Sequence, residues 1–511
     1  MSTTLDPQRD GPVVAERPES GAPRRYDFPN VGEHRLPNGL TVLIVDLPGR
    51  PLVSASMVVV GGAVEEPPEH AGATVLAARA LTEGTDRYEA IALVEAAERL
   101  GASLHAEAGW DALTVGVDVP SDRLAPALDL VAEVLLHPTF PAPEVERLRD
   151  ERLNDLLQAR ADPRRRVEEA FVGTVYAPES PYHRPSGGTR ETVEGLGPDH
   201  LRSAYAAMLH PARATLIVGG DLGGQDVIAN VERLFSGWDG TDGNGSPAGA
   251  IDDTGTSVGR LVRVVHRPGS VHTEIRVGHR GLPRRIPDFH AVSVMGAILG
   301  GLFNSRLNMK LREEKGYTYG AGAGFDMRRG AGPFSSRAAV NTEVTVPAIV
   351  DMLAELERMR DDRVSDVEVA AARDFLVGVF PLRFETAGAV VGALGSLAVH
   401  GLGVEELVTY RSSIEAIGAE AIHEAAVAHL HVADASIVLV GDVDAFGPDL
   451  EAAGLGRIVI ERDEPAEELE APVTEPPTAV DQDEDTGPTA GAEEPDGTVT
   501  GDDPAADPGD A

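Results

Sequence analysis

The chain carries the same strand-like sequence twice, and this repeat limits what it can fold into. Residues 209–221 read LHPARATLIVGGD and residues 430–442 read LHVADASIVLVGD, so the copies lie 221 positions apart. Self-similarity at one fixed spacing is typical of a duplicated structural unit. The length of 511 residues is also too great for one hydrophobic core, because single cores stop growing near roughly 250 to 300 residues. The sequence therefore predicts two homologous domains.

Composition sets the boundaries of these domains. Residues 241–260 are rich in Gly, Asp, Ser and Thr and show no apolar periodicity, which is typical of a linker. Residues 1–25 are polar and proline-rich, and residues 459–511 are strongly acidic. Neither end buries enough apolar surface to offset the entropy lost on ordering, so we expect both to be disordered. The two domains are then expected to span residues 26–240 and 261–458.

Within each half, apolar runs rich in β-branched residues alternate with helical patterns. The expected strands of the first half are 40–47, 52–64, 102–108 and 112–120, and its expected helices are 71–82, 88–100, 122–136, 142–160 and 198–207. The second half repeats the pattern, with strands at 261–266, 272–279, 317–325 and 333–340 and a largely helical run over 344–430. Consecutive strands favour a mostly antiparallel or mixed sheet with helices on one face. We therefore predict an α+β fold in both domains.

Charge and cysteine content exclude several classes of function. The formal net charge is −39, and residues 461–511 hold 18 Asp and Glu against one Arg. An acidic chain is not expected to bind nucleic acid. The absence of cysteine excludes disulfides, thiol nucleophiles and thiolate metal sites. No apolar run approaches the roughly 18 residues of a membrane span, and no secretory signal is visible, so we expect a soluble, cytoplasmic and, from its arginine-rich composition, bacterial protein.

Several motifs resemble a known family. The stretches LPNGLTVLIV and VVVGGAVEEPPEHAG, followed by a helix ending in EGT, resemble the N-terminal domain of the pitrilysin/insulinase zinc peptidases, the inverzincins. The segment GGLFNSRLNMKLREEKGYTYGAGAGF at residues 300–325 is similar to the second domain of that family. The match runs in order from about residue 26 to 458. The resemblance implies a repeated α+β domain and a relation to metallopeptidases.

The zinc-binding motif of that family is missing. Active relatives carry His-x-x-Glu-His on the helix that corresponds to residues 71–82. Residues at i and i+4 share a helix face, so both imidazoles reach one Zn²⁺ while the Glu takes a proton from bound water. The resemblance places these positions at Val75, Ala78 and Arg79, and the third ligand near Asp155. Because Val and Ala have no donor atom and a guanidinium repels a dication, we expect no metal site on this chain.

Other histidines offer no replacement pair. No second His lies four positions from His70, and His423 and His429 are six positions apart and so point from different helix faces. The histidines on strands are better explained as core or edge residues than as metal ligands, and they are His105, His266, His272 and His279.

The second domain keeps two residues that the family uses. In the family, an Arg and a Tyr seven positions later reach toward the zinc-bearing domain, hold the substrate backbone and stabilise the oxyanion; here they are Arg312 and Tyr319. Arg offers a fixed fork of charged donors and Tyr a neutral O–H donor, which suit a carbonyl that acquires negative charge. We expect a helix to end near Lys315 with Gly316 as its left-handed cap, and a strand to begin at Tyr317.

Three functional hypotheses follow. The first is the non-catalytic subunit of a heterodimeric zinc peptidase, which needs no cofactor of its own and works with a zinc-bearing homologous subunit on an extended peptide held at a sheet edge. The second is a scaffold of the same fold; Arg312 and Tyr319 count against it, although singly they also fit a surface ion pair and a half-buried strand aromatic. The third is a hydrolase with other chemistry, for which the sequence offers neither Cys nor a GxSxG motif.

Overall fold

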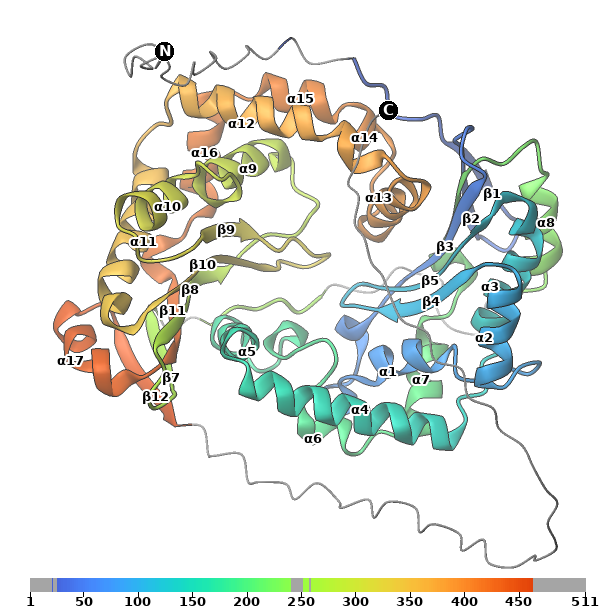
Figure 1. Ribbon diagram of the computed structural model, residues 1–511, viewed down its shortest axis with the longest axis horizontal. Helices are drawn as coiled ribbons and strands as arrows, with labels where there is room; N and C mark the ends of the chain where they lie inside the picture. The colour runs from blue at the N-terminus through green and yellow to red at the C-terminus, as the bar shows by residue number, and fades with distance from the viewer. Residues whose placement is uncertain (1–20, 22–24, 240–250, 257–258, 463–511) are drawn as a thin grey trace, which may run out of the picture. The chain divides into compact units, whose positions relative to one another are not determined.

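The computed structural model describes residues 21, 25–239, 251–256 and 259–462. The expected disordered ends therefore lie mostly outside the described residues, as does much of the expected linker. The described residues belong to one compact unit, which holds two β-sheets of six strands with helices packed on them (Figure 1). Among the described residues, no helix by itself is long and apolar enough to cross a bilayer, while residues 366–384 and 387–400, bent by 113°, meet the criterion only as a pair.

The first sheet is mixed, with strand order β1-β2-β6-β3-β5-β4. Only the β2–β6 pair is parallel, and the other neighbours are antiparallel. The strands are β1 (Gly32–Arg35), β2 (Thr41–Asp46), β3 (Leu52–Val60), β4 (Ser103–Ala108), β5 (Ala112–Pro120) and β6 (Ala214–Gly220). All four strands that the sequence predicts for this half are present.

The second sheet repeats the arrangement, with strand order β12-β7-β11-β8-β10-β9. Its strands are β7 (Leu261–His266), β8 (His272–Arg280), β9 (Ala321–Phe325), β10 (Pro333–Asn341), β11 (Ser436–Gly441) and β12 (Arg457–Arg462). The halves differ at one outer position, where β1 pairs antiparallel with β2 but β12 pairs parallel with β7. Strand β12 also runs past the domain end expected at residue 458. The repeat read from the sequence is thus a repeat of sheet topology.

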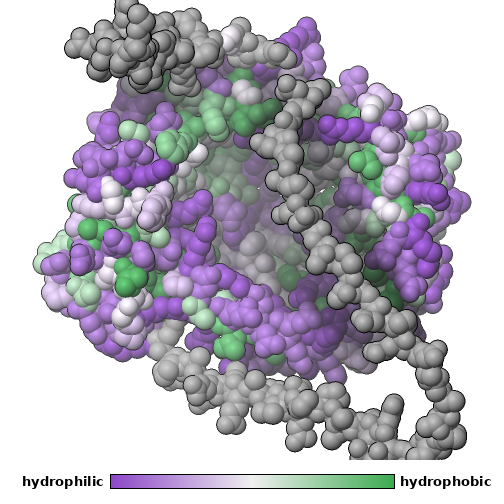
Figure 2. Space-filling model, in the orientation of Figure 1, coloured by the Kyte–Doolittle hydropathy of each residue, from purple (hydrophilic) through white to green (hydrophobic). Residues whose placement is uncertain are grey.

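Helices cover the main apolar face of each sheet. In the first half they include α1 (Ala73–Ala80), α2 (Ala90–Arg99), α3 (Leu124–Leu136), α4 (Ala142–Ala161), α7 (Pro198–Met208) and α8 (Val227–Phe235), and in the second half α9 (Phe289–Gly296), α11 (Thr345–Asp361), α12 (Asp366–Val379), α16 (Ala419–His429) and α17 (Val443–Ala453). The outer side of α4 is polar, as Figure 2 shows along the lower rim of this view. These packed layers confirm the α+β fold in two homologous domains.

The second face of each sheet is covered by a helix from the other half. Helix α5 (Pro163–Val175) belongs to the first half in sequence but packs on β8 and β11, and α13 (Ala387–His400) belongs to the second half but packs on β3 and β6. Val58 and Ile217 share one buried cluster with Leu394 of α13. The sequence analysis placed helices on one face only, so it missed this reciprocal exchange.

Glycines in the strands make room for the exchanged helices. A side chain at Gly219 of β6 would come within 2.9 Å of the Val391 side chain on α13. On the other sheet, a side chain at Gly278 of β8 would come within 2.8 Å of the Phe171 ring on α5. Such distances are shorter than van der Waals contact, so glycine lets the helix approach the backbone of the strand.

Buried ion pairs also fix α5 on the second sheet. Arg276 of β8 is almost fully buried, and its Nε donates to Glu168 of α5 at 2.7 Å. Glu461 of β12 accepts from Arg166 of α5 and from Arg263 of β7. A buried guanidinium is tolerated only when its charge is paired, so removing one partner costs several kcal/mol.

We expect Leu394→Ala on α13 to lower the free energy of unfolding by about 2–5 kcal/mol, because it leaves a cavity against β3 and β6. Denaturant unfolding of the purified chain measures this loss, with both halves unfolding in one transition. Val367→Ala on the 78 % exposed position of α12 is the matched control, with a change within about 0.5 kcal/mol. Equal midpoints for the two variants would contradict the exchanged packing.

Candidate functional site

Helix α1 occupies the place of the missing zinc motif. The Glu66 carboxylate accepts hydrogen bonds from the N–H groups of Gly72, at 2.9 Å, and Thr74, and so holds the start of the helix. Burial raises the pKa of the Glu66 carboxyl, although these hydrogen bonds oppose the shift. Ala78 is fully buried in the first core, and Val75 is half-buried. The helix is therefore packed as a core element.

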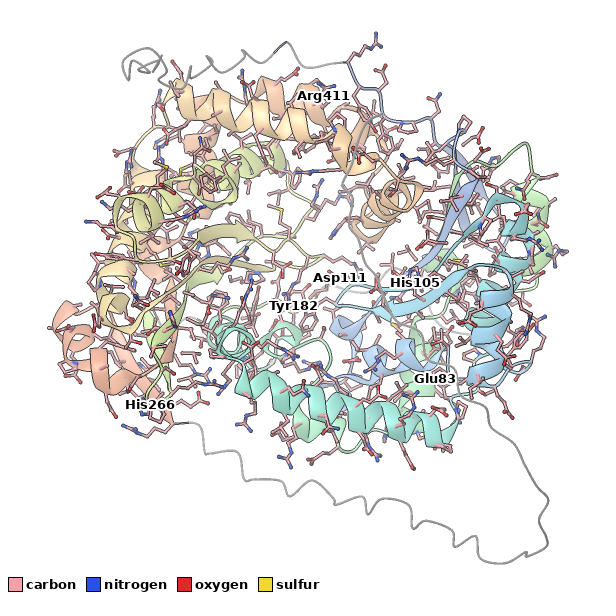
Figure 3. All side chains as sticks on the ribbon, viewed as in Figure 1. Glu83, His105, Asp111, Tyr182, His266 and Arg411 are labelled. Atoms are coloured by element: carbon pink, nitrogen blue, oxygen red, sulfur yellow. The ribbon has the colours of Figure 1, made fainter. Side chains whose placement is uncertain are left out.

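Arg79 is held by a carboxylate of α4. Its guanidinium lies 2.8 Å from Glu151, and Glu151 also pairs with Arg147 at 2.5 Å. Arg147 reaches Glu83 just after α1 as well, at 2.7 Å (Figure 3 labels Glu83). The Arg147 guanidinium, and then Arg79, hold the pKa of the Glu151 carboxyl below its usual range. A network of oppositely charged side chains thus surrounds Arg79, at the position where the family has its second histidine.

Asp155, the counterpart of the third ligand, is also fully engaged. Its Oδ1 accepts from Arg165 at 2.8 Å and its Oδ2 accepts from Arg152 at 2.5 Å. The Arg165 guanidinium is the largest cause of a lowered pKa for this carboxyl. Arg152 is anchored in turn by donating to the Gly187 carbonyl at 2.9 Å. The donor set does not fit zinc, because the carboxylate next to α1 faces two arginines and α1 supplies no ligand atom.

Arg312 lies on a π-helical turn, residues Met309–Glu314, that ends as the sequence predicts. Lys315 is its C-terminal cap and Gly316 has φ 66°, the left-handed conformation. The side chain of Arg312 is 38 % exposed, and its ion-pair neighbour is the adjacent Glu313 at 3.6 Å. No hydrogen bond from this guanidinium is found within the described part of the chain. The N–H donors of Arg312 are therefore not used by the described residues.

Tyr319 lies in the loop before β9, and its side chain is 98 % exposed. The prediction that a strand begins at Tyr317 is wrong, since β9 begins at Ala321. The Thr318 hydroxyl donates to the Gly320 carbonyl at 2.9 Å, and this local turn lifts Tyr319 out of the sheet. With such exposure the ring contacts almost nothing in this chain, so the structure does not bring it against Arg312.

Two further residues, one beside Arg312 and one beside the loop that carries Tyr319, were not identified from the sequence. The ring of Phe303 lies 4.6 Å from the guanidinium carbon of Arg312. Asn308 donates through Nδ2 to the Leu302 carbonyl at 3.2 Å and accepts through Oδ1 from the Ala321 N–H at 2.8 Å. The sequence signal for both residues was only their position inside the segment 300–325.

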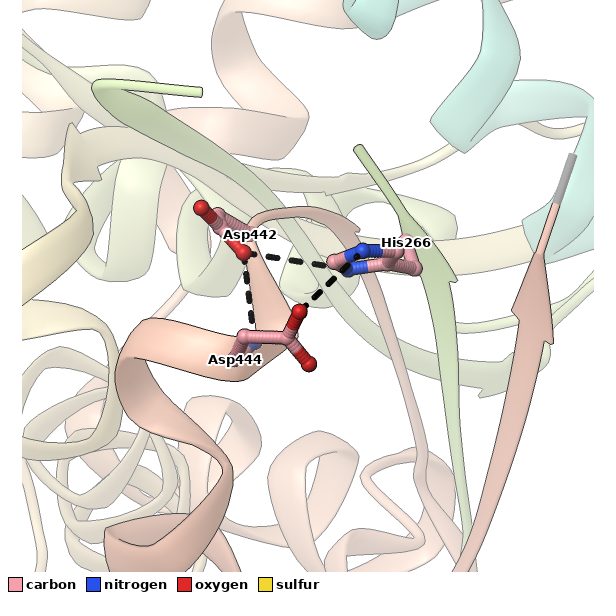
Figure 4. A group of neighbouring side chains, drawn as sticks. All are labelled: His266, Asp442 and Asp444. Carbon is pink, nitrogen blue, oxygen red and sulfur yellow. Dashed lines mark hydrogen bonds and ion pairs between the residues drawn. The ribbon is translucent and has the colours of Figure 1, made fainter. Parts of the chain in front are cut away.

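One group of potential metal ligands lies elsewhere, where His266 meets the start of α17 (Figure 4). His266 Nδ1 lies 3.8 Å from Asp442, and Nε2 lies 3.6 Å from Asp444. The Val443 N–H donates to Nδ1 at 3.3 Å, and the Gly269 N–H donates to Asp442 at 2.8 Å. The two carboxylates thus flank different nitrogens of one ring, and Asp442 also accepts from the N–H groups of Gly269 and Asp444. The group is better explained as hydrogen bonding at the start of a helix than as a cation site.

The other strand histidines have structural partners. His279 is buried, with Nδ1 2.7 Å from the Arg280 carbonyl and Nε2 accepting from the His431 N–H at 3.1 Å. Burial lowers the pKa of His279 to about 4. His105, labelled on β4 in Figure 3, is exposed and packs across the backbone of Gly116 on β5. His272 is exposed. These positions agree with core and edge roles.

A polar junction joins the two halves at the connection between β4 and β5. Asp111 accepts from the Arg329 N–H at 3.0 Å, and the guanidinium of Arg328 lies over the rings of Trp110, at 5.0 Å, and Tyr182, at 4.7 Å. Asp111 and Tyr182 are labelled in Figure 3. Burial raises the pKa of the Asp111 carboxyl. The junction is an interlock of the halves that sequence analysis did not foresee.

Comparison with known domain families gives two matches. Residues 41–184 match the family described as Insulinase (Peptidase family M16), and residues 195–376 match the domain described as Peptidase M16 inactive domain. The first match contains α1 and Asp155, and the second contains Arg312 and Tyr319.

Some relatives are described as zinc proteases and another as a non-peptidase homolog. A Mycobacterium tuberculosis protein described as an uncharacterized zinc protease is 27 % identical over 371 residues, which cover 70 % of this chain and 82 % of the relative. The Helicobacter pylori non-peptidase homolog YmxG is 22 % identical over 381 residues, 73 % of this chain and 84 % of that protein.

Solved structures confirm the fold. A crystal structure of a peptidase M16 inactive domain from Pseudomonas fluorescens has a TM-score of 0.74 at 24 % identity, covering 81 % of this chain and 98 % of its own. A crystal structure of a protease from Helicobacter pylori has a TM-score of 0.76 at 17 % identity, covering 81 % and 100 %.

We expect the purified chain to bind no stoichiometric zinc at α1, because Arg79 and Asp155 are held in ion pairs. Calorimetric titration of the protein with zinc measures this. Combining Val75→His with Arg79→His places two imidazoles at i and i+4 and is the control that should gain zinc affinity. One tightly bound zinc per unmodified chain, lost on Asp155→Ala, would contradict the expectation.

His279 should make the chain less stable in mild acid. Its pKa is about 4 in the folded chain but near 6.5 when unfolded, so the unfolded chain binds the proton first and stability falls as pH drops from 6.5 toward 4. Between pH 7 and pH 5, His279→Gln should lose about 2 kcal/mol less unfolding free energy than the unmodified chain. His272→Gln, at an exposed position, is the control, and equal slopes for all three proteins would exclude this role for His279.

Proposed function

Because this chain is a member of the insulinase family of peptidases, family M16, we propose that it is the non-catalytic subunit of a two-chain zinc peptidase. In this proposal a homologous partner subunit carries the zinc and cleaves the peptide. This chain holds the peptide and stabilises the transition state. Alone it has no peptidase activity.

The contrast between two arginines supports this proposal. Arg79 occupies the position of a zinc ligand, and its guanidinium is paired with Glu151 of the same chain. Arg312, in the place of a substrate-holding residue, lies 3.6 Å from the adjacent Glu313 and makes no hydrogen bond to the described residues. The positions of the family's substrate-holding pair thus carry a guanidinium that makes no hydrogen bond to the described residues and an exposed tyrosine, which supports a retained binding role.

The two side chains are suited to one task. The scissile carbonyl oxygen gains negative charge when the peptide is attacked, and donors aimed at it lower the barrier. Arg312 supplies charged N–H donors in a fixed geometry and Tyr319 supplies a neutral O–H donor. Neither residue removes a proton, so the chemical step itself belongs to the partner subunit.

An extended peptide needs an open sheet edge, and β4 offers one. At β9 the outward N–H of Ala321 is already bound by Asn308, and Gly300 packs directly against Ala323. The described residues of β4 hydrogen-bond only to β5 within the backbone, and their side chains alternate between exposed and half-buried. We therefore place the peptide along β4, where main-chain hydrogen bonds would bind many sequences.

A scaffold without a proteolytic role is the second candidate. One relative, from Helicobacter pylori, is described as a non-peptidase homolog. The full exposure of Tyr319 also fits a residue that contacts a partner protein. A scaffold would use Arg312 and Tyr319 for association alone, which the following experiment distinguishes.

Co-expression with a family member that carries His-x-x-Glu-His should give an assembly that cleaves short peptides which neither chain cleaves alone. Tyr319→Phe should lower kcat of the assembly by roughly 10²-fold, because one donor to the oxyanion is lost. Tyr317→Phe, two positions away with its ring against the second core, is the matched control. Cleavage that is indifferent to Tyr319→Phe, with the assembly intact by gel filtration, would favour the scaffold.

A further inference from the structure

Phe303 is an aromatic residue at an unusual position. It lies between two π-helical segments, Ala297–Gly301 and Met309–Glu314, and its side chain is 67 % exposed. π-Helical turns are rare and are frequent at functional sites. A single exposed apolar side chain is common at protein surfaces, so what the Phe303 ring contacts there decides its role.

The ring of Phe303 contacts the guanidinium of Arg312. The guanidinium carbon lies 4.6 Å from the centre of the Phe303 ring, within the range of a cation–π interaction. Several other arginines of the described residues are positioned by carboxylates, as Arg276 is by Glu168. A carboxylate occupies N–H donors, whereas a ring contacts the flat face and leaves the N–H edges free.

We propose that Phe303 is a positioning residue that acts through Arg312. Its ring orients the guanidinium plane without using the donors that would bind the peptide carbonyl. The inference rests on the proposed function of Arg312 and names a residue that this function requires.

The side-chain amide of Asn308 holds the loops around the Phe303–Arg312 contact in place. Asn308 donates to the Leu302 carbonyl, next to Phe303, and accepts from the N–H of Ala321, two residues after Tyr319. One side chain thus ties the Phe303 loop to the end of the Tyr319 loop. Gly300 has no room for a side chain because it packs on the Ala323 backbone. The loop that carries Phe303 is therefore braced, and its ring can serve as a fixed support.

The experiment uses the two-subunit assembly and three variants of this chain. Phe303→Leu removes the ring and keeps an apolar side chain, and it should lower kcat/KM by roughly 2- to 5-fold, the range of an exposed cation–π contact. Phe303→Tyr keeps the ring and should retain activity. In an Arg312→Ala background, Phe303→Leu should cause no further loss, because Phe303 acts through Arg312. An undiminished loss in that background would overturn the proposal and assign Phe303 a contact of its own with the peptide.

A measurement on this chain alone separates failure of the proposal from failure of the proposed function. In protein with ¹⁵N-labelled arginine side chains, the Arg312 Nε–H resonance, assigned by its loss in Arg312→Lys, should be shifted upfield by the ring. Phe303→Leu should abolish that shift, and Phe303→Tyr should keep it. An Arg312 resonance that Phe303→Leu leaves in place would refute the positioning role even if the assembly is active. A shift that vanishes as expected in an assembly without activity would refute only the proposed function.

Discussion

Each β-sheet of this chain has two apolar faces, but its own half supplies helices for only one of them. The other face is closed by a single helix from the other half, α13 on the first sheet and α5 on the second. Without this exchange, Val58 and Ile217 would face water on the first sheet. A contiguous apolar patch exposed on a sheet promotes association, so we do not expect either half to be stable as a separate monomer. Stability of the zinc-less half therefore depends on the half that carries Arg312.

The local sequence pattern was enough to predict most strands of the sheets, but it did not predict that each half contributes a helix to the sheet of the other. Strands such as β3 and β8 were predicted because buried β-branched runs are recognisable from sequence alone. Helix α5 was missed although Val167 and Phe171 follow the helical period, because three arginines precede them and its partners on β8 and β11 lie about 100 and about 270 residues away. Edge strands β1 and β12 were missed for another reason: their side chains are mostly exposed, so their sequences show no regular alternation of apolar and polar residues.

Residue types alone predicted that α1 cannot hold zinc, since Ala78 has no donor atom in any fold. They could not predict what takes the place of the metal. The pairing of Arg79 with Glu151 joins residues 72 positions apart, and Asp155 is held by Arg152 of its own helix together with Arg165 of the next helix, α5. The start of β9 was mispredicted because the Thr318 turn competes with the sheet for backbone hydrogen bonds. Polar side-chain geometry, unlike apolar periodicity, is fixed only by tertiary contacts.

These two kinds of arginine site lead to a physical criterion for a lost and a retained function. Where chemistry has been lost, charges are neutralised within the chain, because an unpaired charge near a core is costly; the Arg152–Asp155–Arg165 group is the example. Where binding is retained, donors must stay unsatisfied until the ligand arrives, so they remain at the surface and are oriented by groups that do not accept hydrogen bonds. Phe303 beside Arg312 meets that requirement, and no carboxylate could. Stability does not explain this arrangement, since an exposed ring and an exposed tyrosine add little to the folding free energy, whereas the proposed peptide-binding role of Arg312 does.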